Sequence, residues 1–378
     1  MKKKSVVVCF FLVLSFMFTF FGCTHKNVDT SPEYNPETDY NIWYEQFGYG
    51  TRFIETEDGF YYLTREKFLR FIDKNTMKEI ALCNKPNCSH WRGDENKCNS
   101  YMGAMAPEEL YYYKGKLYGF TDRSSADELG FSGICLSEIS KDGSSIKKIW
   151  ELQWKGGSSG YFQSGALHRG IYYFYTNTEN SISIYAYDME TKKCKCIYDD
   201  PDRMGTQLKA IGDYLYWRFP KSSCPDDYSV MRYEISTGKI DEFDGFTAMI
   251  AGGERVYFRR FDEEKGSLIS YTGRDGKNIV NTDISLEGVL SSGDDFFFGM
   301  VSEGEKANTI LVYDSETMEL VDELDISSLL QITHLDYVLS GNDELFFVTN
   351  IERTHIFYAY KSTIGTPDFQ WHQVEKVN

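Results

Sequence analysis

The feature that most constrains the fold is a short aromatic motif that recurs seven times along the chain. In each copy a turn or a charge precedes an aliphatic or aromatic residue, which is followed by two aromatic residues or close equivalents. The middle residues of the copies are 57, 54, 44, 41, 40 and 49 residues apart, and they are Tyr61, Tyr118, Tyr172, Tyr216, Tyr257, Phe297 and Phe346. Self-similarity at such a period is typical of repeat architectures.

Each repeat also contains turn signals that divide it into strands. The second strand of the third copy ends in Tyr187-Asp188-Met189-Glu190-Thr191, and similar Asp-x-x-Thr segments recur in other copies. Asp and Thr side chains promote such turns by bonding to nearby backbone groups. Four turn-linked strands in 40–50 residues match one blade of a β-propeller. We therefore predict an all-β protein with seven four-stranded blades over residues 51–376.

The aromatic content agrees with this fold. The chain has 28 tyrosines and 27 phenylalanines, and aromatic residues make up 16% of it. Tyrosine and phenylalanine favour strands, and the central strands of a blade are buried on both faces. We expect most of these rings to pack between blades, with few of them contacting a ligand.

The amino terminus has the pattern of an export signal. Lys2, Lys3 and Lys4 precede an apolar run over residues 6–21, and Gly22-Cys23 follows it. A basic start, an apolar core and a small residue at the break are typical of a secretory signal peptide. The run is short for a membrane span, which needs about 20 apolar residues. An uncleaved amino-terminal anchor is the alternative, and both place the body outside the cytoplasm.

The end of this segment resembles the lipobox of bacterial lipoproteins, in which cleavage precedes a cysteine that becomes lipid-modified. Gly22 and Cys23 fit the pattern, whereas that family usually has Leu in place of Phe20 and a small residue in place of Phe21. The resemblance implies a signal peptide over residues 1–22 and a lipid on Cys23. A tether over residues 23–50 would then hold the body at the outer face of the bacterial cytoplasmic membrane.

The repeats themselves resemble those of a known group. Their form, a turn followed by Leu-Tyr-Tyr and later by Tyr-Asp-x-x-Thr-x-Lys, is similar to that of uncharacterised surface lipoproteins of Gram-positive bacteria. The propellers of those proteins are catalogued as a domain of unknown function related to the low-density-lipoprotein-receptor type. The resemblance supports the fold and implies no activity.

A cysteine cluster interrupts the repeats between the first and second blades. Cys83, Cys88, His90 and Cys98 form a Cys-x4-Cys-x-His-x7-Cys insert over residues 83–98, similar to a segment that those lipoproteins carry after their first blade. Three thiolates and an imidazole suit a tetrahedral Zn²⁺ site. Outside the cytoplasm a disulfide that pins a surface loop is the stronger expectation, and free thiols are a third alternative.

The cysteine count bears on these alternatives. If residues 1–22 are removed and Cys23 carries lipid, seven cysteines remain, namely the three of the cluster with Cys135, Cys194, Cys196 and Cys224. Seven is odd, so at least one thiol stays outside any intramolecular disulfide. This slightly favours a metal or a free cysteine in the cluster.

The charge balance excludes one class of partner. The chain has 57 acidic and 40 basic residues, for a net charge of −17, and loss of the three lysines in residues 1–22 would make it −20. Nucleic-acid binding needs clustered Lys and Arg, so we expect no nucleic-acid partner. We expect a monomer.

No catalytic constellation stands out. Gly156-Gly157-Ser158-Ser159-Gly160 matches the nucleophile elbow, but no amphipathic helix follows it as that motif requires. We therefore predict no catalytic or cofactor-binding residue. The favoured function is a membrane-anchored, non-enzymatic binding or scaffold module, with exposed loops and Trp217 or Trp371 contacting a glycan, peptide or protein. The alternative is an extracellular hydrolase or lyase with its active site at the mouth of the propeller channel.

Overall fold

The structure is a computed structural model of the whole chain. It describes residues 29, 31, 33–40, 53–64, 66–83, 85, 87–90, 98–103, 109–123, 133–153, 165–177, 181–220, 228–252, 254–286, 290–300, 308–331, 335–349 and 355–377. Residues 31–378 form one compact unit, which contains all of the described strands.

The strands fall into seven sheets. The first comprises β1 (Phe53–Glu55), β2 (Gly59–Leu63), β3 (Leu69–Asp73), β4 (Lys78–Ala81) and β29 (Glu375–Val377). The second and third comprise β5 (Glu109–Tyr113), β6 (Lys116–Arg123), β7 (Gly133–Ile139) and β8 (Ile146–Gln153), then β9 (Gly165–His168), β10 (Ile171–Asn177), β11 (Ile182–Asp188) and β12 (Cys194–Asp200).

The remaining four sheets follow the same order. The fourth and fifth comprise β13 (Thr206–Ile211), β14 (Tyr214–Pro220), β15 (Tyr228–Glu234) and β16 (Ile240–Asp244), then β17 (Phe246–Gly252), β18 (Arg255–Asp262), β19 (Gly266–Gly273) and β20 (Val280–Ser285). The sixth and seventh comprise β21 (Leu290–Ser292), β22 (Phe296–Met300), β23 (Thr309–Asp314) and β24 (Leu320–Asp325), then β25 (Leu335–Ser340), β26 (Glu344–Thr349), β27 (Ile356–Tyr360) and β28 (His372–Gln373). A short helix α2 (Ser327–Leu330) and a 3₁₀ turn (Lys361–Thr363) are the other elements among the described residues.

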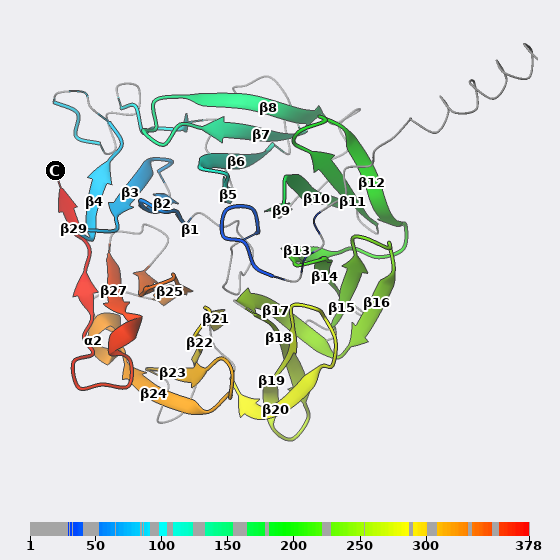
Figure 1. Cartoon of the computed structure of the whole chain (residues 1–378). Coiled ribbons are helices and arrows are strands. Elements are labelled where there is room, and N and C mark those ends of the chain that lie inside the picture. The colour runs from blue at the N-terminus through cyan, green and yellow to red at the C-terminus, as the bar shows by residue number, and fades with distance from the viewer. Residues whose placement is uncertain are drawn as a thin grey trace, which may run out of the picture. The chain divides into compact units, whose positions relative to one another are not determined.

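The seven sheets are the blades of a propeller, which confirms the predicted fold (Figure 1). In every blade four consecutive strands pair antiparallel in chain order. The middle residue of each aromatic motif lies on the second strand of its blade, from Tyr61 on β2 to Phe346 on β26. The sequence period therefore equals one blade.

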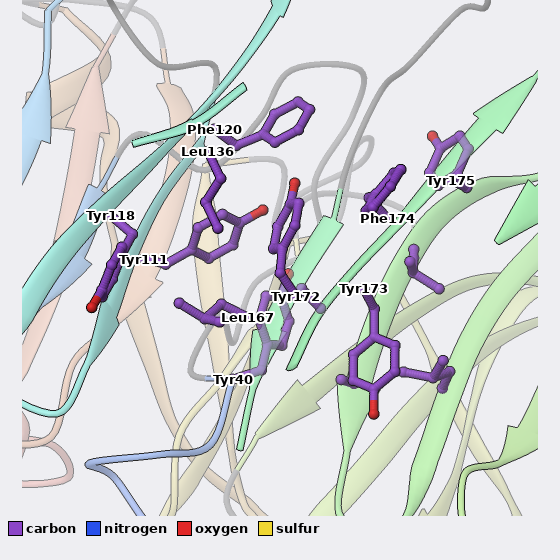
Figure 2. Packing of buried hydrophobic residues seen from close by; sticks show 14 of the residues in the cluster. Tyr40, Tyr111, Tyr118, Phe120, Leu136, Leu167, Tyr172, Tyr173, Phe174 and Tyr175 are labelled. Atoms are coloured by element: carbon purple, nitrogen blue, oxygen red, sulfur yellow. The ribbon is translucent and has the colours of Figure 1, made fainter. Parts of the chain in front are cut away.

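The aromatic side chains fill the spaces between neighbouring blades. Tyr257 of the fifth blade stacks on Phe297 of the sixth with ring centroids 4.5 Å apart. Tyr111 of the second blade meets Tyr172 of the third edge-on at 5.7 Å, and Figure 2 shows these rings among the other buried side chains. All four are almost fully buried, so the motif supplies packing between blades.

The predicted aspartate turns also form. The carboxylate of Asp188 accepts hydrogen bonds from the backbone N–H groups of Glu190 and Thr191 at 2.8 and 2.9 Å. Asp314 binds the N–H groups of Glu316 and Thr317 in the same way. These side chains set the hairpin between the third and fourth strands of a blade.

The fifth strand of the first blade closes the ring. Strand β29 comes from the carboxyl end of the chain and pairs in parallel with the outer strand β4, with Glu375 opposite Lys78. The two side chains form an ion pair of 3.0 Å. The seventh blade thus passes the chain directly to the outer edge of the first (Figure 1).

Candidate binding pocket and metal centre

Residues 33–40, from the stretch expected to be a tether, lie at the centre of the ring. In Figure 1 they form the dark blue loop inside the first strands of the blades. The backbone N–H groups of Lys114 and Arg169 donate to the carbonyls of Glu37 and Thr38 at 2.9 and 2.6 Å. Both donors sit in turns between the first and second strands of a blade, so the segment crosses one mouth of the ring. We call residues 33–40 the plug.

A buried carboxylate fixes the plug. Arg169 donates to both oxygens of Asp39, at 2.7 Å from Nε and 2.9 Å from an Nη, and Arg274 adds a contact of 3.1 Å. Burial alone would raise the pKa of Asp39, but the hydrogen bonds and charges of the two arginines outweigh it and hold the pKa below its usual value. The third and fifth blades are therefore bridged through the plug.

His168 holds the end of the plug as a neutral imidazole. The backbone N–H of Tyr40 donates to Nδ1 of His168 at 3.0 Å, so the ring proton is on Nε2, which donates to the carbonyl of Gly212 at 2.9 Å. Burial lowers the pKa of His168 to about 4, and the ring is uncharged at neutral pH. The centroid of the Tyr40 ring lies 6.5 Å from that of Tyr111, and Figure 2 shows both side chains in the buried cluster.

Beside the plug the same mouth contains a pocket of about 310 Å³. The plug, the first blade, the hairpin of β25 and β26 in the seventh blade and one residue of the second blade form its wall. The lining residues are Tyr34, Pro36, Glu37, Phe53, Glu55, Thr56, Glu57, Phe60, Lys74, Tyr112, Leu339, Ser340, Gly341, Asn342 and Phe346. We call it the mouth pocket. Its volume is at the lower end of the roughly 300–1,000 Å³ of small-molecule sites.

One polar wall of the mouth pocket is built around Glu55. Its Oε1 accepts from Lys74 at 2.7 Å and its Oε2 accepts from the backbone N–H of Asn342 at 2.9 Å. Lys74 also lies 3.6 Å from Asp343. Burial would lower the pKa of Lys74, but the bond to Glu55 outweighs it and the pKa is raised. Lys74 is therefore a fixed cation in this wall.

A second acidic group, Glu57, lies at the rim. Its oxygens accept from the hydroxyl of Tyr112 and from Nζ of Lys141, the latter at 2.9 Å. These two hydrogen bonds lower the pKa of Glu57. Each of these two carboxylates thus has a cation of the chain beside it.

Glu344, just behind this wall, has a different environment. Its side chain is buried, and its Oε2 has no hydrogen-bond partner among the described residues. Burial raises the pKa of Glu344 to about 7, with Lys74 acting against this and Glu55 adding to it. A carboxyl group with such a pKa can carry a proton at neutral pH. It is absent from the wall of the mouth pocket.

The four residues of the cysteine cluster come together at the edge of the first blade. The sulfur atoms of Cys83, Cys88 and Cys98 and a ring nitrogen of His90 all lie within 4.8 Å of one another, and the three cysteines are thiols. The Sγ of Cys98 is 3.7 Å from Nδ1 of His90. A tetrahedral zinc ion with Zn–S bonds of about 2.3 Å needs sulfur atoms roughly 3.8 Å apart. This cluster could hold a metal ion.

The surroundings of the cluster orient its ligands. Cys83 follows β4 after one residue, and its sulfur accepts a hydrogen bond from the backbone N–H of Asn99 at 3.3 Å. His90 lies in the left-handed region, with φ of 54°, and its carbonyl accepts from Arg70 of β3. Burial raises the pKa of Cys83, but the N–H donors of Asn99 and Lys85 outweigh it and the pKa is lowered. Burial raises the pKa of Cys88 to about 11.

Other residues singled out by sequence lie elsewhere. Cys23 and Ser158 are outside the described residues. Trp217 is fully buried against Tyr198, with ring centroids 4.9 Å apart, so its expected ligand contact is wrong. The ring of Trp371 packs against that of Phe347, with the ring centroids 5.9 Å apart.

Sequence reasoning missed the plug and the mouth pocket. Asp39, Arg169 and Arg274 are far apart in sequence and belong to no local motif. The pocket wall likewise draws on five separate stretches of the chain, and its members Phe60 and Phe346 carried a signal only as part of the aromatic repeat. The residues that form the plug contacts and the mouth pocket recur at no fixed spacing, so a single sequence does not reveal either feature.

Comparison with solved structures supports the propeller fold. The β-propeller domain of the Trilobed protease from Pyrococcus furiosus is 12% identical, with 87% of this chain and 98% of that chain covered and a TM-score of 0.50. An uncharacterised protein from Listeria monocytogenes is 11% identical, with 57% of this chain and 67% of that chain covered and a TM-score of 0.39. An oligogalacturonate lyase in complex with manganese is 12% identical, with 76% of this chain and 80% of that chain covered and a TM-score of 0.40. At these identities the likeness concerns the fold alone.

No model of a known protein family matches the chain, and no curated protein matches it. In the part of the chain that the structure describes, none of the helices has the length and apolar character of a membrane span.

Proposed function

We propose that this protein is a membrane-held, non-enzymatic binding propeller whose ligand occupies the mouth pocket. One observation carries the proposal. The chain's own plug lies across one mouth at the centre of the ring, where the buried contacts of Asp39 with Arg169 and Arg274 hold it. The pocket beside the plug is concave, partly aromatic and polar, as ligand sites are. Binding at this mouth therefore needs no displacement of the plug.

Attachment to the membrane is part of the proposal. The signal-like segment before Gly22-Cys23 supports lipid modification of Cys23 and an extracytoplasmic body. Wild type should lack residues 1–22 and take up an alkyne fatty acid, and replacement Cys23→Ser should abolish both. An uncleaved anchor predicts that wild type keeps residues 1–22 and takes up no label.

Binding is tested with the full-length protein in detergent. A glycan and peptide array is probed with wild type and with Asn342→Ala, an exposed residue in the pocket wall. Asn308→Ala, an exposed residue of the sixth blade before β23, is the matched control. Signals that fall only in Asn342→Ala support the pocket. Signals that are equal in all three proteins overturn it.

The hydrolase or lyase alternative has one observation in its favour, the raised pKa of Glu344. It is outweighed because Glu344 is 3% exposed and the pocket carboxylates Glu55 and Glu57 are bound by lysines of the chain. If the alternative holds, Glu344→Gln removes the turnover of a substrate that wild type cleaves. The binding proposal expects Glu344→Gln to bind the array ligands as wild type does.

A second proposal concerns the cysteine cluster, which we infer to be a structural zinc site. Three sulfur atoms and one imidazole nitrogen complete four-coordination and leave no open position for a reacting water, as in structural zinc sites. The metal would fasten the loop after β4 to the outer edge of the first blade.

Elemental analysis of the purified full-length protein tests this. We expect about one zinc per chain. Cys83→Ser and Cys98→Ser should lose it, and Cys194→Ser, which removes an exposed thiol on β12, should retain it. Absence of zinc together with a disulfide between two cluster cysteines in peptide mass spectra would overturn the proposal.

A further inference from the structure

We propose that the mouth pocket binds the neutral, hydroxyl-rich end of a glycan, one or two pyranose rings long. This inference rests on the proposed function, because it names the ligand of the same pocket. It follows from three properties of the wall, namely its charge, the hydrogen-bonding capacity it has left and its half-buried aromatic rings.

The charge of the wall favours a neutral ligand. Glu55 is paired with Lys74 at 2.7 Å, and Glu57 is paired with Lys141 at 2.9 Å. Each of these lysines is also shared with a second carboxylate, Lys74 with Asp343 at 3.6 Å and Lys141 with Asp58 at 2.8 Å, so a cationic ligand would have to compete with a bound lysine for these oxygens. An anionic ligand would meet these carboxylates as well as Glu37 and Asp343 near the same rim. An anionic ligand is therefore repelled, and a cationic ligand gains contacts only where it displaces a lysine of the chain, whereas a neutral ligand meets neither obstacle.

The wall nevertheless keeps both acceptors and donors for a ligand. A carboxylate has about four acceptor positions, and the structure shows two hydrogen bonds to Glu55 and two to Glu57. An ammonium group has three donors, and Lys74 directs its contacts to Glu55 and Asp343. The amide of Asn342 is exposed and offers both functions. A sugar hydroxyl donates and accepts at once, so it matches such a mixed wall.

The aromatic part of the wall suits the flat face of a sugar ring. Phe60 and Phe346 are buried against each other with centroids 4.6 Å apart, and they support Phe53 in front of them. Phe53 and Tyr34 are half-buried and line the pocket. The negative face of an aromatic ring attracts the polarised C–H bonds of a pyranose. The pocket thus pairs an apolar platform with a polar wall.

The wall is also rigid before a ligand arrives. Lys74 is held by Glu55, by Asp343 and by the face of Phe60, whose centroid is 5.8 Å from Nζ. Glu55 connects the first blade to the backbone of the seventh at Asn342. A preorganised polar wall loses little conformational entropy on binding, which favours a small ligand with few contacts.

The experiment uses full-length protein in detergent and three sets of probes. The probes are neutral oligosaccharides (gluco-, manno-, galacto- and chito-oligosaccharides), a cationic oligolysine and an anionic oligogalacturonide. Saturation-transfer NMR detects binding, and calorimetry gives affinities for wild type, Lys74→Met and Asn342→Ala. Lys116→Met, which removes an exposed lysine paired with Glu138 at 3.0 Å, and Asn308→Ala are the matched controls.

We expect a neutral oligosaccharide to bind, Asn342→Ala to weaken it roughly 3- to 10-fold and Lys74→Met to weaken it at least as much. The two controls should bind as wild type. Intact near-ultraviolet circular dichroism of Lys74→Met and Asn342→Ala shows that the effect is not unfolding.

The outcomes separate this inference from the proposed function. If oligolysine or oligogalacturonide binds and the pocket variants weaken that binding, the neutral-glycan class is overturned while the pocket stands. If an oligosaccharide binds equally to all variants, the mouth pocket is not its site and both proposals fail. If no neutral oligosaccharide binds, the glycan inference is overturned.

Discussion

Arg169 donates hydrogen bonds of 2.7 and 2.9 Å to the two carboxylate oxygens of Asp39, although the two residues are 130 positions apart in the sequence. The side chains are 3% and 0% exposed, and Arg274 joins them at 5%. A buried ion pair of this kind costs much in desolvation, and removal of one partner leaves the other charge uncompensated. The plug is therefore a bonded part of the ring.

Replacement Asp39→Ala should lower the free energy of unfolding by about 3–5 kcal/mol, because two guanidinium groups stay buried without their carboxylate. Urea unfolding followed by tryptophan fluorescence measures the change. Asp283→Ala is the control, since it removes an exposed carboxylate paired with Lys265 at 2.8 Å, and it should match wild type within error. Equal midpoints for the two variants would show that the plug contributes nothing to stability.

We expect the residues of the aromatic motif to stabilise the fold by packing between blades. Phe297 is fully buried and stacks on Tyr257, so Phe297→Ala should cost about 3–5 kcal/mol through lost contacts and a cavity. Phe261, near the end of β18, is 54% exposed, and Phe261→Ala should change stability by less than about 0.5 kcal/mol. Thermal unfolding of both variants checks this, and similar losses would contradict the packing role.

The sequence predicted the parts of the fold that repeat. Aromatic residues at a fixed place in each blade and aspartates such as Asp188 in the turns are local signals, because each acts on strands or amides a few residues away. They were enough for seven blades of four strands. The strand β29 was not predicted as a separate strand, since a segment of three residues has no period of its own, and its pairing with β4 is set by ring closure.

The candidate sites divide in the same way. The cluster of Cys83, Cys88, His90 and Cys98 was visible because its members are close in sequence and chemically distinctive. The sequence could not decide between a disulfide and a metal site. That choice depends on whether the imidazole of His90 lies close to the sulfur atoms in space. The mouth pocket is composed of common residues such as Glu55 and Lys74 from separate segments, and only the closed ring brings them together.

If the cysteine cluster holds the proposed zinc, removal of the metal should loosen the outer edge of the first blade. Cys83 follows β4 closely, and β4 is the strand on which β29 closes the ring. In protein treated with a chelator, or in Cys98→Ser, we expect amide hydrogen exchange in β4 and β29 to rise about tenfold or more. Exchange in β18 and β19 of the fifth blade should not change. A uniform response across all blades, or none, would contradict a local structural role for the metal.

The stability of the ring should fall as pH rises through the titration of Glu344. Burial raises its pKa to about 7 in the folded protein, against roughly 4.3 in an unfolded chain. Well below about pH 4 both states are protonated. Between about pH 4.3 and 7 the unfolded state releases its proton while the folded state keeps it, so unfolding becomes easier with each step in pH, and the loss levels off above about pH 7.

The variant Glu344→Gln mimics the protonated group and removes this dependence. Between about pH 5 and pH 8, the free energy of unfolding of wild type should fall by about 2–3 kcal/mol relative to that of Glu344→Gln, as measured by urea unfolding. Glu375→Gln, at a carboxylate 71% exposed, is the control and should follow the wild-type curve. Parallel curves for wild type and Glu344→Gln would mean that Glu344 is ionised in the folded protein throughout this range. The same result would remove the one observation that favours a general acid at this mouth of the ring.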